Sequence, residues 1–409
     1  MPISLEIPKK MKVLQDQAHQ VAAEVLRPIS RKYDLAEHEY PKELDMLAAL
    51  IDGMNDSGGQ GASAAGDAAS KKPETEEKPD DGAAKNGANL AGVLGVTEMC
   101  WGDVGLLLTM PRQGLGNSAI AAVASDEQKE RFEGKWAAMA ITEPEAGSDS
   151  AAIRTTAKLD GDEYVLNGEK IYVTSGDRAD LIVVWASLDL DQGRAAIKSF
   201  VVERDNPGLK LDRLEHKLGI KASDTANFIL TDCRVPKENL LGSPEIDTKK
   251  SFAGAMKTFD NTRPLVAGMA VGLAQACLEE TRRILEEAGV EIDYDRPANA
   301  QSAATAEFLE LESDYEAARL LMLEAAWMAD NKKPNSVEAS FSKAKAGRSG
   351  TDIALRCVAL CGSIGYSEGE LLEKWARVAK ILDIFEGTQQ IQLLVIARQL
   401  LGLTSAELK

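Results

Sequence analysis

One carboxylate near the end of the chain, Glu386, has surroundings that could make it a strong base. It lies within residues 384–390 (IFEGTQQ), between apolar stretches at 375–384 and 391–401. A carboxylate that loses its water becomes more basic, which suits the removal of a proton from carbon. Composition alone favours a solvated acidic cap at a helix junction, so both interpretations stay open at this point.

A second polar segment, residues 141–149 (ITEPEAGSD), follows an apolar run that stops at Pro144. Small residues and hydroxyls at such a turn can offer hydrogen-bond donors to a phosphate or to a ring carbonyl. An ordinary surface loop is the alternative, and composition alone favours it.

A third segment, residues 259–264 (FDNTRP), brings Asp260 and Arg263 into an otherwise apolar helical stretch. Charges in such a place are costly unless they are paired or take part in function. Pro264 should kink this helix or remove one of its hydrogen bonds.

The elements that must position these segments begin with helices. Apolar residues recur at three-four spacing over residues 11–26, and helix is also expected over 42–54 and from residue 89 onward. The Ser125–Gln128 stretch has the pattern of a capping box and predicts another short helix. Residues 55–86 are Gly, Ala, Ser, Asp, Lys, Glu and Pro, which bury too little to offset the entropy of ordering, so we expect a disordered insertion there.

A change of period between Trp136 and about Gly242 predicts an antiparallel sheet. Two strands are expected within residues 153–174, about a turn at 160–162, with a second turn at 167–168. The other expected strands are 135–142, 181–186, 198–203 and 225–232.

From Phe252 onward the pattern is helical again, with long apolar stripes typical of a bundle. The sequence therefore predicts an α+β chain with an N-terminal helical domain (1–135), a middle antiparallel β-domain (136–245) and a C-terminal helical bundle (246–409). The expected helices of the bundle are 251–288, 303–330, 336–360, 371–382 and 388–401.

Bulk properties exclude several classes of partner. The 409 residues carry a net charge of −18, which argues against nucleic acid and anionic membranes. No apolar run approaches the ~20 residues of a membrane span. Five scattered cysteines and the lack of a secretion signal predict reduced thiols in a cytoplasmic protein. Cys357 and Cys361 share a helix face, but the three histidines are distant in sequence, so no metal site is expected.

Familiar nucleotide and nucleophile motifs do not occur in the sequence. There is no G-x-G-x-x-G after a strand, no P-loop and no G-x-S-x-G elbow. A nucleotide would therefore have to be held by another device.

Taken together and in their order along the chain, the three polar segments (141–149, 259–264 and 384–390) resemble the acyl-CoA dehydrogenase family. Residues 167–174 (NGEKIYVT) and 217–225 (KLGIKASDT), followed by Val235-Pro236, add to the resemblance, which covers roughly residues 118–401. The 259–264 segment is most similar to the medium-chain branch. The family fold of helices, β-domain and helical bundle agrees with the order found from periodicity.

The resemblance implies FAD as cofactor and Glu386 as the base that removes the α-proton of an acyl-CoA thioester, while the flavin N5 takes the β-hydride. Some branches place the base at the position of Thr262, where threonine cannot serve. Electron-transfer flavoprotein is the implied acceptor. The implied cofactor residues are Met139, Ile141, Thr142, Gly147, Ser148, Tyr172, Val173, Thr174, Thr388 and Gln390, and the implied substrate residues are Ser148, Asp260, Asn261, Thr262, Arg263 and Gly387.

Two departures from the family pattern fall on the half of the flavin site that a neighbouring subunit usually supplies. Glu291 and Asp295 replace the arginine and glycine of an R-x-x-F-G segment, and Ala359 and Ser363 replace a glutamine and a glycine. A glutamate would repel a pyrophosphate. We therefore expect an α2β2 heterotetramer, as in mycobacterial-type enzymes that act on steroid side chains, in which a related chain supplies the arginine.

Several alternatives remain open at this stage. A different alignment would let Arg282, Arg283 or Arg296 replace the missing arginine. The chain could also be a non-catalytic or assembly subunit of such a complex, although Glu386 is retained, or an acyl-CoA oxidase-type enzyme that releases peroxide.

Overall fold

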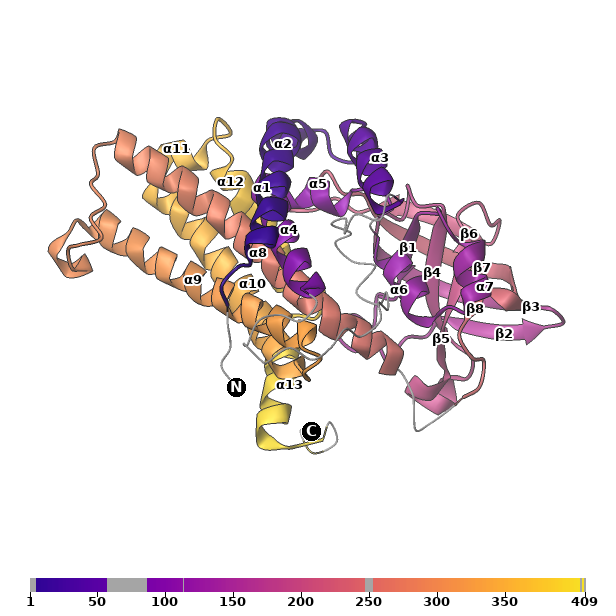
Figure 1. Ribbon diagram of the computed structural model, residues 1–409. Coiled ribbons are helices and arrows are strands. Elements are labelled where there is room, and N and C mark those ends of the chain that lie inside the picture. Colours follow the sequence, from indigo (N-terminus) through magenta and orange to yellow (C-terminus); the bar gives the residue numbers. More distant parts are fainter. Residues whose placement is uncertain (1–4, 57–86, 113, 247–252, 405–406, 408–409) are drawn as a thin grey trace.

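The computed structural model shows long helices on one side of the molecule and a β-sheet on the other, with α4 packed against the long helices α8 and α9 and α1 packed against α4 (Figure 1). It describes residues 5–56, 87–112, 114–246, 253–404 and 407, and only the backbone of 50–56 and 253–261. The expected disordered insertion thus lies outside the described residues from position 57 on, while residues 55 and 56 still belong to helix α3.

The N-terminal helices extend further than the periodicity predicts. α1 (Lys9–Val21) passes through a π-helical turn (Ala22–Leu26) into α2 (Arg27–Leu35). The capping box is confirmed, because Ser125 and Gln128 exchange side-chain-to-backbone hydrogen bonds of 3.0 and 3.2 Å. The other helices of this part are α3 (Glu43–Asp56), α4 (Ala88–Gly102), α5 (Val104–Leu108), α6 (Leu115–Val123) and α7 (Asp126–Arg131).

Eight strands form one sheet in the order β6-β7-β3-β2-β4-β5-β8, with β1 paired to β4. The pairings are antiparallel except those of β4 with β1 and β2, which are parallel. The sheet was thus expected correctly, although β6 and β8 were missed. The strands are β1 (Ala137–Ala140), β2 (Thr156–Asp160), β3 (Glu163–Thr174), β4 (Leu181–Ser187), β5 (Ile197–Glu203), β6 (Leu209–Leu214), β7 (Thr225–Pro236) and β8 (Leu240–Leu241).

One expected turn is present in the sheet and one is not. The turn at 160–162 joins β2 to β3, with Gly161 in the left-handed region. The turn expected at 167–168 is wrong, because β3 continues through it with a shift of register against β7. A Cβ at Gly168 would lie 2.4 Å from Thr155 Oγ1, so this glycine allows close strand packing within a bulge.

The C-terminal helices agree closely with the periodicity. α8 continues past Pro264 without a break, and its buried face packs with α4, α9, α10 and α12 in one apolar core. None of the described helices combines the length and apolar content that a membrane span requires. The helices are α8 (Ala253–Glu287), α9 (Ala303–Asp330), α10 (Ser336–Leu360), α11 (Gly362–Tyr366), α12 (Leu372–Ala379) and α13 (Gln389–Leu401), with a 3-10 turn at Lys380–Asp383.

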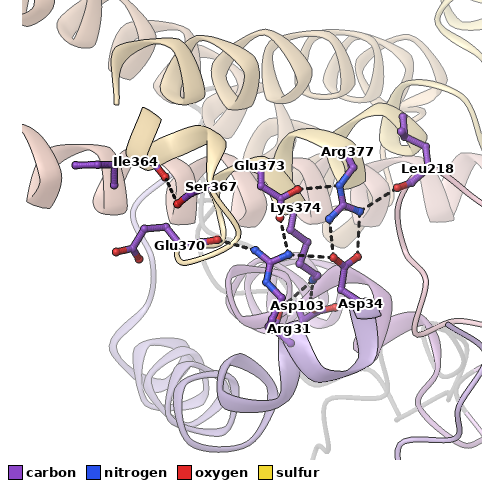
Figure 2. Close-up of polar contacts among 11 residues, drawn as sticks. Arg31, Asp34, Asp103, Leu218, Ile364, Ser367, Glu370, Glu373, Lys374 and Arg377 are labelled. Atoms are coloured by element: carbon purple, nitrogen blue, oxygen red, sulfur yellow. Dashed lines mark hydrogen bonds and ion pairs between the residues drawn. The ribbon is translucent and has the colours of Figure 1, made fainter. Parts of the chain in front are cut away.

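Ion pairs between buried and half-buried side chains join α12 to the N-terminal helices (Figure 2). Arg377 donates to both carboxylate oxygens of Asp34, at 2.5 and 3.1 Å, and Arg31 lies 3.2 Å from the same carboxylate. Lys374 pairs with Asp103 beneath them. We call Arg31, Asp34, Asp103, Glu373, Lys374 and Arg377 the α2–α12 ion network.

The connection between strands β6 and β7 also contacts α12. Arg377 donates to the carbonyl of Leu218 at 3.0 Å, in the connection between β6 and β7. A Cβ at the next residue, Gly219, would lie 2.6 Å from the Cα of Val378. The chain that leads from α12 to Glu386 is therefore held by both the N-terminal helices and the sheet.

Candidate active site

Glu386 stands on a tight turn between the 3-10 turn and α13. Both Glu386 (φ 55°) and Gly387 (φ 91°) are in the left-handed region. A Cβ at residue 387 would lie 2.4 Å from Nε2 of Gln392, so the position requires glycine. Thr388 then caps α13 by accepting a hydrogen bond from the Ile391 N–H at 3.3 Å.

Two buried side chains hold the carbonyls of this turn. Lys343 of α10 donates to the Gly387 carbonyl at 2.6 Å. Gln392 of α13 donates to the carbonyls of both Glu386 and Gly387 at 3.2 Å. No acceptor among the described residues takes a hydrogen bond from the Glu386 peptide N–H, which remains available to a ligand.

The Glu386 carboxylate is enclosed and weakly partnered. Among the described residues its one hydrogen bond is from the Thr262 hydroxyl, at 3.0 Å. Glu386 keeps some exposed surface as a whole, yet burial of the carboxylate raises its pKa above the usual value, while Thr262 and the charges of Lys343 and Arg263 oppose that rise. Such a carboxylate is more basic than one in water.

Residues 262 and 263 of α8 also lie close to the Glu386 turn. Thr262 contacts Glu386 directly, so the two positions that could carry a base converge. Arg263 is buried and donates to Ser340 of α10 at 3.4 Å. Asp260 and Asn261 lie on α8, but their side chains are outside the described residues.

The turn after β1 is held by a buried ion pair that the sequence did not reveal. Lys170 of β3 lies 2.6 Å from Glu143, whose carboxylate also accepts from the backbone of Arg154 and Thr155 at 2.6 and 3.0 Å. Burial would raise the pKa of Glu143, but the Lys170 charge and these hydrogen bonds hold it below its ordinary range. Residues 141–146, which we call the platform, are therefore anchored to β3 and to residues 154–155.

Beside this platform lies Tyr172, which is 61% exposed and adopts a left-handed backbone (φ 57°). The N–H of its neighbour Ile171 donates to the Thr142 carbonyl at 2.9 Å, which joins the two segments. Gly147 and Ser148 are exposed. An open aromatic face next to hydroxyls and backbone donors fits a flat, polar ring system such as a flavin.

The other expected cofactor residues are distributed unevenly. Met139, Ile141, Thr142, Thr174 and Thr388 are half-buried, and Gln390 is exposed. The side chain of Val173 is 1% exposed and packs in the sheet core, which leaves its backbone as the part that could meet a cofactor. No hydrogen bond or ion pair between described residues joins the platform to Glu386.

Two surface cavities of about 410 and 400 Å³ lie elsewhere. Neither is lined by Glu386 or by the platform, so their size does not mark them as the site of chemistry.

A group of possible metal ligands also lies away from this site. Glu37, His38 and His216 have ligand atoms within 4.8 Å of one another. Two histidines that are distant in sequence are thus neighbours in space. The positive charge of Lys217 acts on His38, which opposes a dication there. Cys357 and Cys361 are free, buried thiols.

Comparison with known proteins decides the family. Residues 138–233 match the acyl-CoA dehydrogenase middle domain, and residues 252–401 match the acyl-CoA dehydrogenase C-terminal domain. The mitochondrial short-chain specific acyl-CoA dehydrogenase of Bos taurus is 32% identical over 406 residues, 97% of this chain and 92% of the relative. The chain belongs to the acyl-CoA dehydrogenase family.

Further likenesses agree with this family assignment. The Mus musculus short-chain enzyme is 39% identical over 267 residues, which span 65% of this chain and 63% of that relative. Butyryl-CoA dehydrogenase from Megasphaera elsdenii is 29% identical, with a TM-score of 0.80 over 98% of this chain and 100% of that one. The two mitochondrial relatives are named short-chain specific, whereas the 259–264 segment had indicated the medium-chain branch. Acyl-CoA dehydrogenases are FAD-dependent flavoproteins, so this family member is assigned FAD.

Three buried polar side chains of the site, Lys170, Lys343 and Gln392, were not found from the sequence. A signal existed for Lys343, which is a lone charge among small residues such as Ala339, Ala344 and Gly347 on the buried face of α10. The same reasoning, that a charge in an apolar helix must be paired or functional, had singled out Arg263.

Proposed function

We propose that this chain catalyses the FAD-dependent α,β-dehydrogenation of an acyl-CoA thioester, with Glu386 as the base that removes the α-proton. One observation carries the proposal: an enclosed carboxylate whose pKa is raised and whose hydrogen-bond partner, among the described residues, is a single hydroxyl. The raised pKa makes this carboxylate a stronger base, which suits the removal of a proton from carbon.

The Glu386 turn also supplies a donor for the substrate. An α-proton is a poor acid, so the thioester carbonyl must be polarised while the proton leaves. The Glu386 N–H makes no hydrogen bond to the described residues and is available for that carbonyl. Base and electrophilic donor would thus belong to one residue.

The flavin would rest on the platform after β1 and against Tyr172. When bound, it supplies the acceptor for the β-hydride. Val173 would contribute through its backbone, because its side chain is buried in the sheet core. The residues proposed to hold the cofactor are Met139, Ile141, Thr142, Gly147, Ser148, Tyr172, Val173, Thr174, Thr388 and Gln390.

A short acyl-CoA is the first substrate to test, because the relatives described above are short-chain enzymes. The residues proposed to hold it are Ser148, Asp260, Asn261, Thr262, Arg263 and Gly387. We also propose domain boundaries at 1–135, 136–245 and 246–409.

The test is anaerobic mixing of the purified FAD-loaded protein with butyryl-CoA while flavin absorbance is followed. Loss of the oxidised flavin band is expected in the native protein, and Glu386→Gln should slow it by about 10³-fold or more. Glu368→Gln, at an exposed position, is the matched control. Unchanged reduction in Glu386→Gln would favour a non-catalytic or assembly subunit.

The electron acceptor is proposed to be an electron-transfer flavoprotein. Reoxidation of the reduced protein by such a flavoprotein, with little peroxide in air, is the expected result. Stoichiometric peroxide release would instead identify an oxidase-type enzyme.

We further propose an α2β2 heterotetramer with a related chain. Glu291 and Asp295 are exposed in the α8–α9 connection, and Ala359 and Ser363 are exposed at the end of α10 and the start of α11. No arginine stands at these positions to meet a neighbour's flavin pyrophosphate.

The arginines that could replace the missing one are engaged within this chain. Arg282 pairs with Glu312 at 2.5 Å, Arg283 pairs with Glu287 at 2.8 Å, and Arg296 donates to the Ala300 carbonyl at 3.1 Å. Native mass spectrometry of the chain alone and with candidate partners tests the assembly. One flavin per subunit in the chain alone would contradict it.

A further inference from the structure

Lys343 is a buried lysine that makes no ion pair with the part of the chain that the structure describes. It is 1% exposed on α10, and among the described residues no carboxylate oxygen lies within 4.0 Å of its ammonium. Burial lowers the pKa of Lys343 to about 8. An ammonium removed from water without a paired anion is costly, so its retention calls for a role.

The contact that Lys343 makes is with the backbone of the Glu386 turn. Its 2.6 Å hydrogen bond ends on the Gly387 carbonyl, one residue after the carboxylate proposed as base. A glutamate in the left-handed region is strained and persists only when its surroundings hold it there. Lys343 and Gln392 are the side chains that hold these carbonyls.

The charge of Lys343 acts on the same carboxylate. Around it lie Asp383 and Glu386, which favour its charged form, and Arg263, which opposes it. Asp383 is itself paired with Lys380 at 2.9 Å. Lys343 and Arg263 thus favour the ionised form of Glu386, against the effect of burial.

We propose that Lys343 is a positioning residue for the base: it fixes the Glu386–Gly387 turn through the Gly387 carbonyl, and its positive charge favours the ionised form of the Glu386 carboxylate. The inference rests on the proposed function, in which Glu386 removes the α-proton. It assigns to Lys343 no contact with substrate or flavin.

Two variants separate the two roles. Lys343→Met keeps the length of the side chain but removes both donor and charge. Lys343→Gln removes the charge and retains a donor, and it serves if the methionine variant folds poorly. Lys345→Met is the matched control, because Lys345 lies on the same helix and pairs with Asp314 of α9 at 2.6 Å.

The experiment measures amide hydrogen exchange in peptides that cover residues 384–389, and the rate of flavin reduction by butyryl-CoA against pH. Lys343→Met should exchange faster in those peptides and at the wild-type rate elsewhere. Its reduction rate should fall about tenfold or more with little change in KM, and the acid limb of the pH profile should move up by about half a unit. Lys343→Gln should show the shifted limb with a smaller change in exchange.

Wild-type exchange at 384–389 in Lys343→Met would overturn the proposal whatever the rate. A wild-type acid limb in both variants would overturn the role of the charge. If Glu386→Gln retained full activity, the proposed function would fail, whereas the exchange result would still decide whether Lys343 fixes the turn.

Discussion

Asp34 and Glu386 are both enclosed carboxylates, yet their surroundings give them opposite properties. Asp34 takes two hydrogen bonds from Arg377 and lies beside Arg31 and Lys374 (Figure 2). Among the described residues, the Glu386 carboxylate accepts one hydrogen bond, from the Thr262 hydroxyl. Burial would raise both pKa values, but at Asp34 the cations outweigh burial and lower the pKa, whereas at Glu386 burial prevails. Partners, more than burial, separate a structural carboxylate from one suited to chemistry.

The largest expected effect comes from removing the partners of Asp34. Arg377→Met leaves that carboxylate enclosed with fewer cations, so the free energy of unfolding should fall by about 3 kcal/mol in urea titrations. Arg348→Met, which breaks an exposed pair with Asp352, should cost less than about 0.5 kcal/mol. Equal losses in the two variants would remove the distinction between the network and a surface pair.

Next comes the turn itself. Gly387→Ala places a methyl group 2.4 Å from Gln392 Nε2, at a φ of 91°. We expect the rate of flavin reduction to fall about 100-fold, because the carboxylate moves while the fold remains. Far-ultraviolet circular dichroism checks the fold, and a wild-type rate would show that the turn does not position Glu386.

The pH dependence of stability should distinguish the two carboxylates. The pKa of Asp34 is lower in the folded protein than the ordinary 3.8, so its contribution is present above pH 3.8 and is lost as the pH falls through the folded value. Asp34→Asn should therefore lessen the loss of unfolding free energy between about pH 5 and about pH 3. Glu386→Gln should instead raise stability at neutral pH, because the raised pKa of Glu386 makes its ionised form destabilising there.

The smallest expected effect comes from removing the Thr262 hydroxyl that donates to Glu386. Thr262→Val removes the hydrogen bond that lowers the pKa of Glu386, so the acid limb of the pH–rate profile should move to higher pH. The rate above that limb should change by less than about fivefold. Stopped-flow reduction of the flavin at several pH values measures both, and a limb that moved to lower pH would contradict the assignment.

Periodicity and capping predicted most of the fold, since α9 and α10 begin and end at the expected residues and Ser125 caps α7. The turn expected at 167–168 failed because a strand bulge and a hairpin turn use the same Asn-Gly pair. Only the pairing of β3 with distant β7 decides between them.

The candidate site was predicted less completely. Glu386 was recognised through its apolar flanks and a family resemblance. Lys343 and Gln392 were not, because their contacts with residues 386 and 387 depend on how α10 and α13 pack around the turn. Such contacts leave no periodic trace in a sequence.

Gly219 allows the β6–β7 connection to pack very closely against α12. With no side chain there, the β6–β7 connection lies almost backbone to backbone against α12, and the neighbouring Leu218 carbonyl is tied to Arg377. A larger residue at position 219 would clash with the backbone of α12 and push the β6–β7 connection away from this helix. A methyl group at residue 219 would therefore alter how the β6–β7 connection packs on α12, the helix that precedes the Glu386 turn.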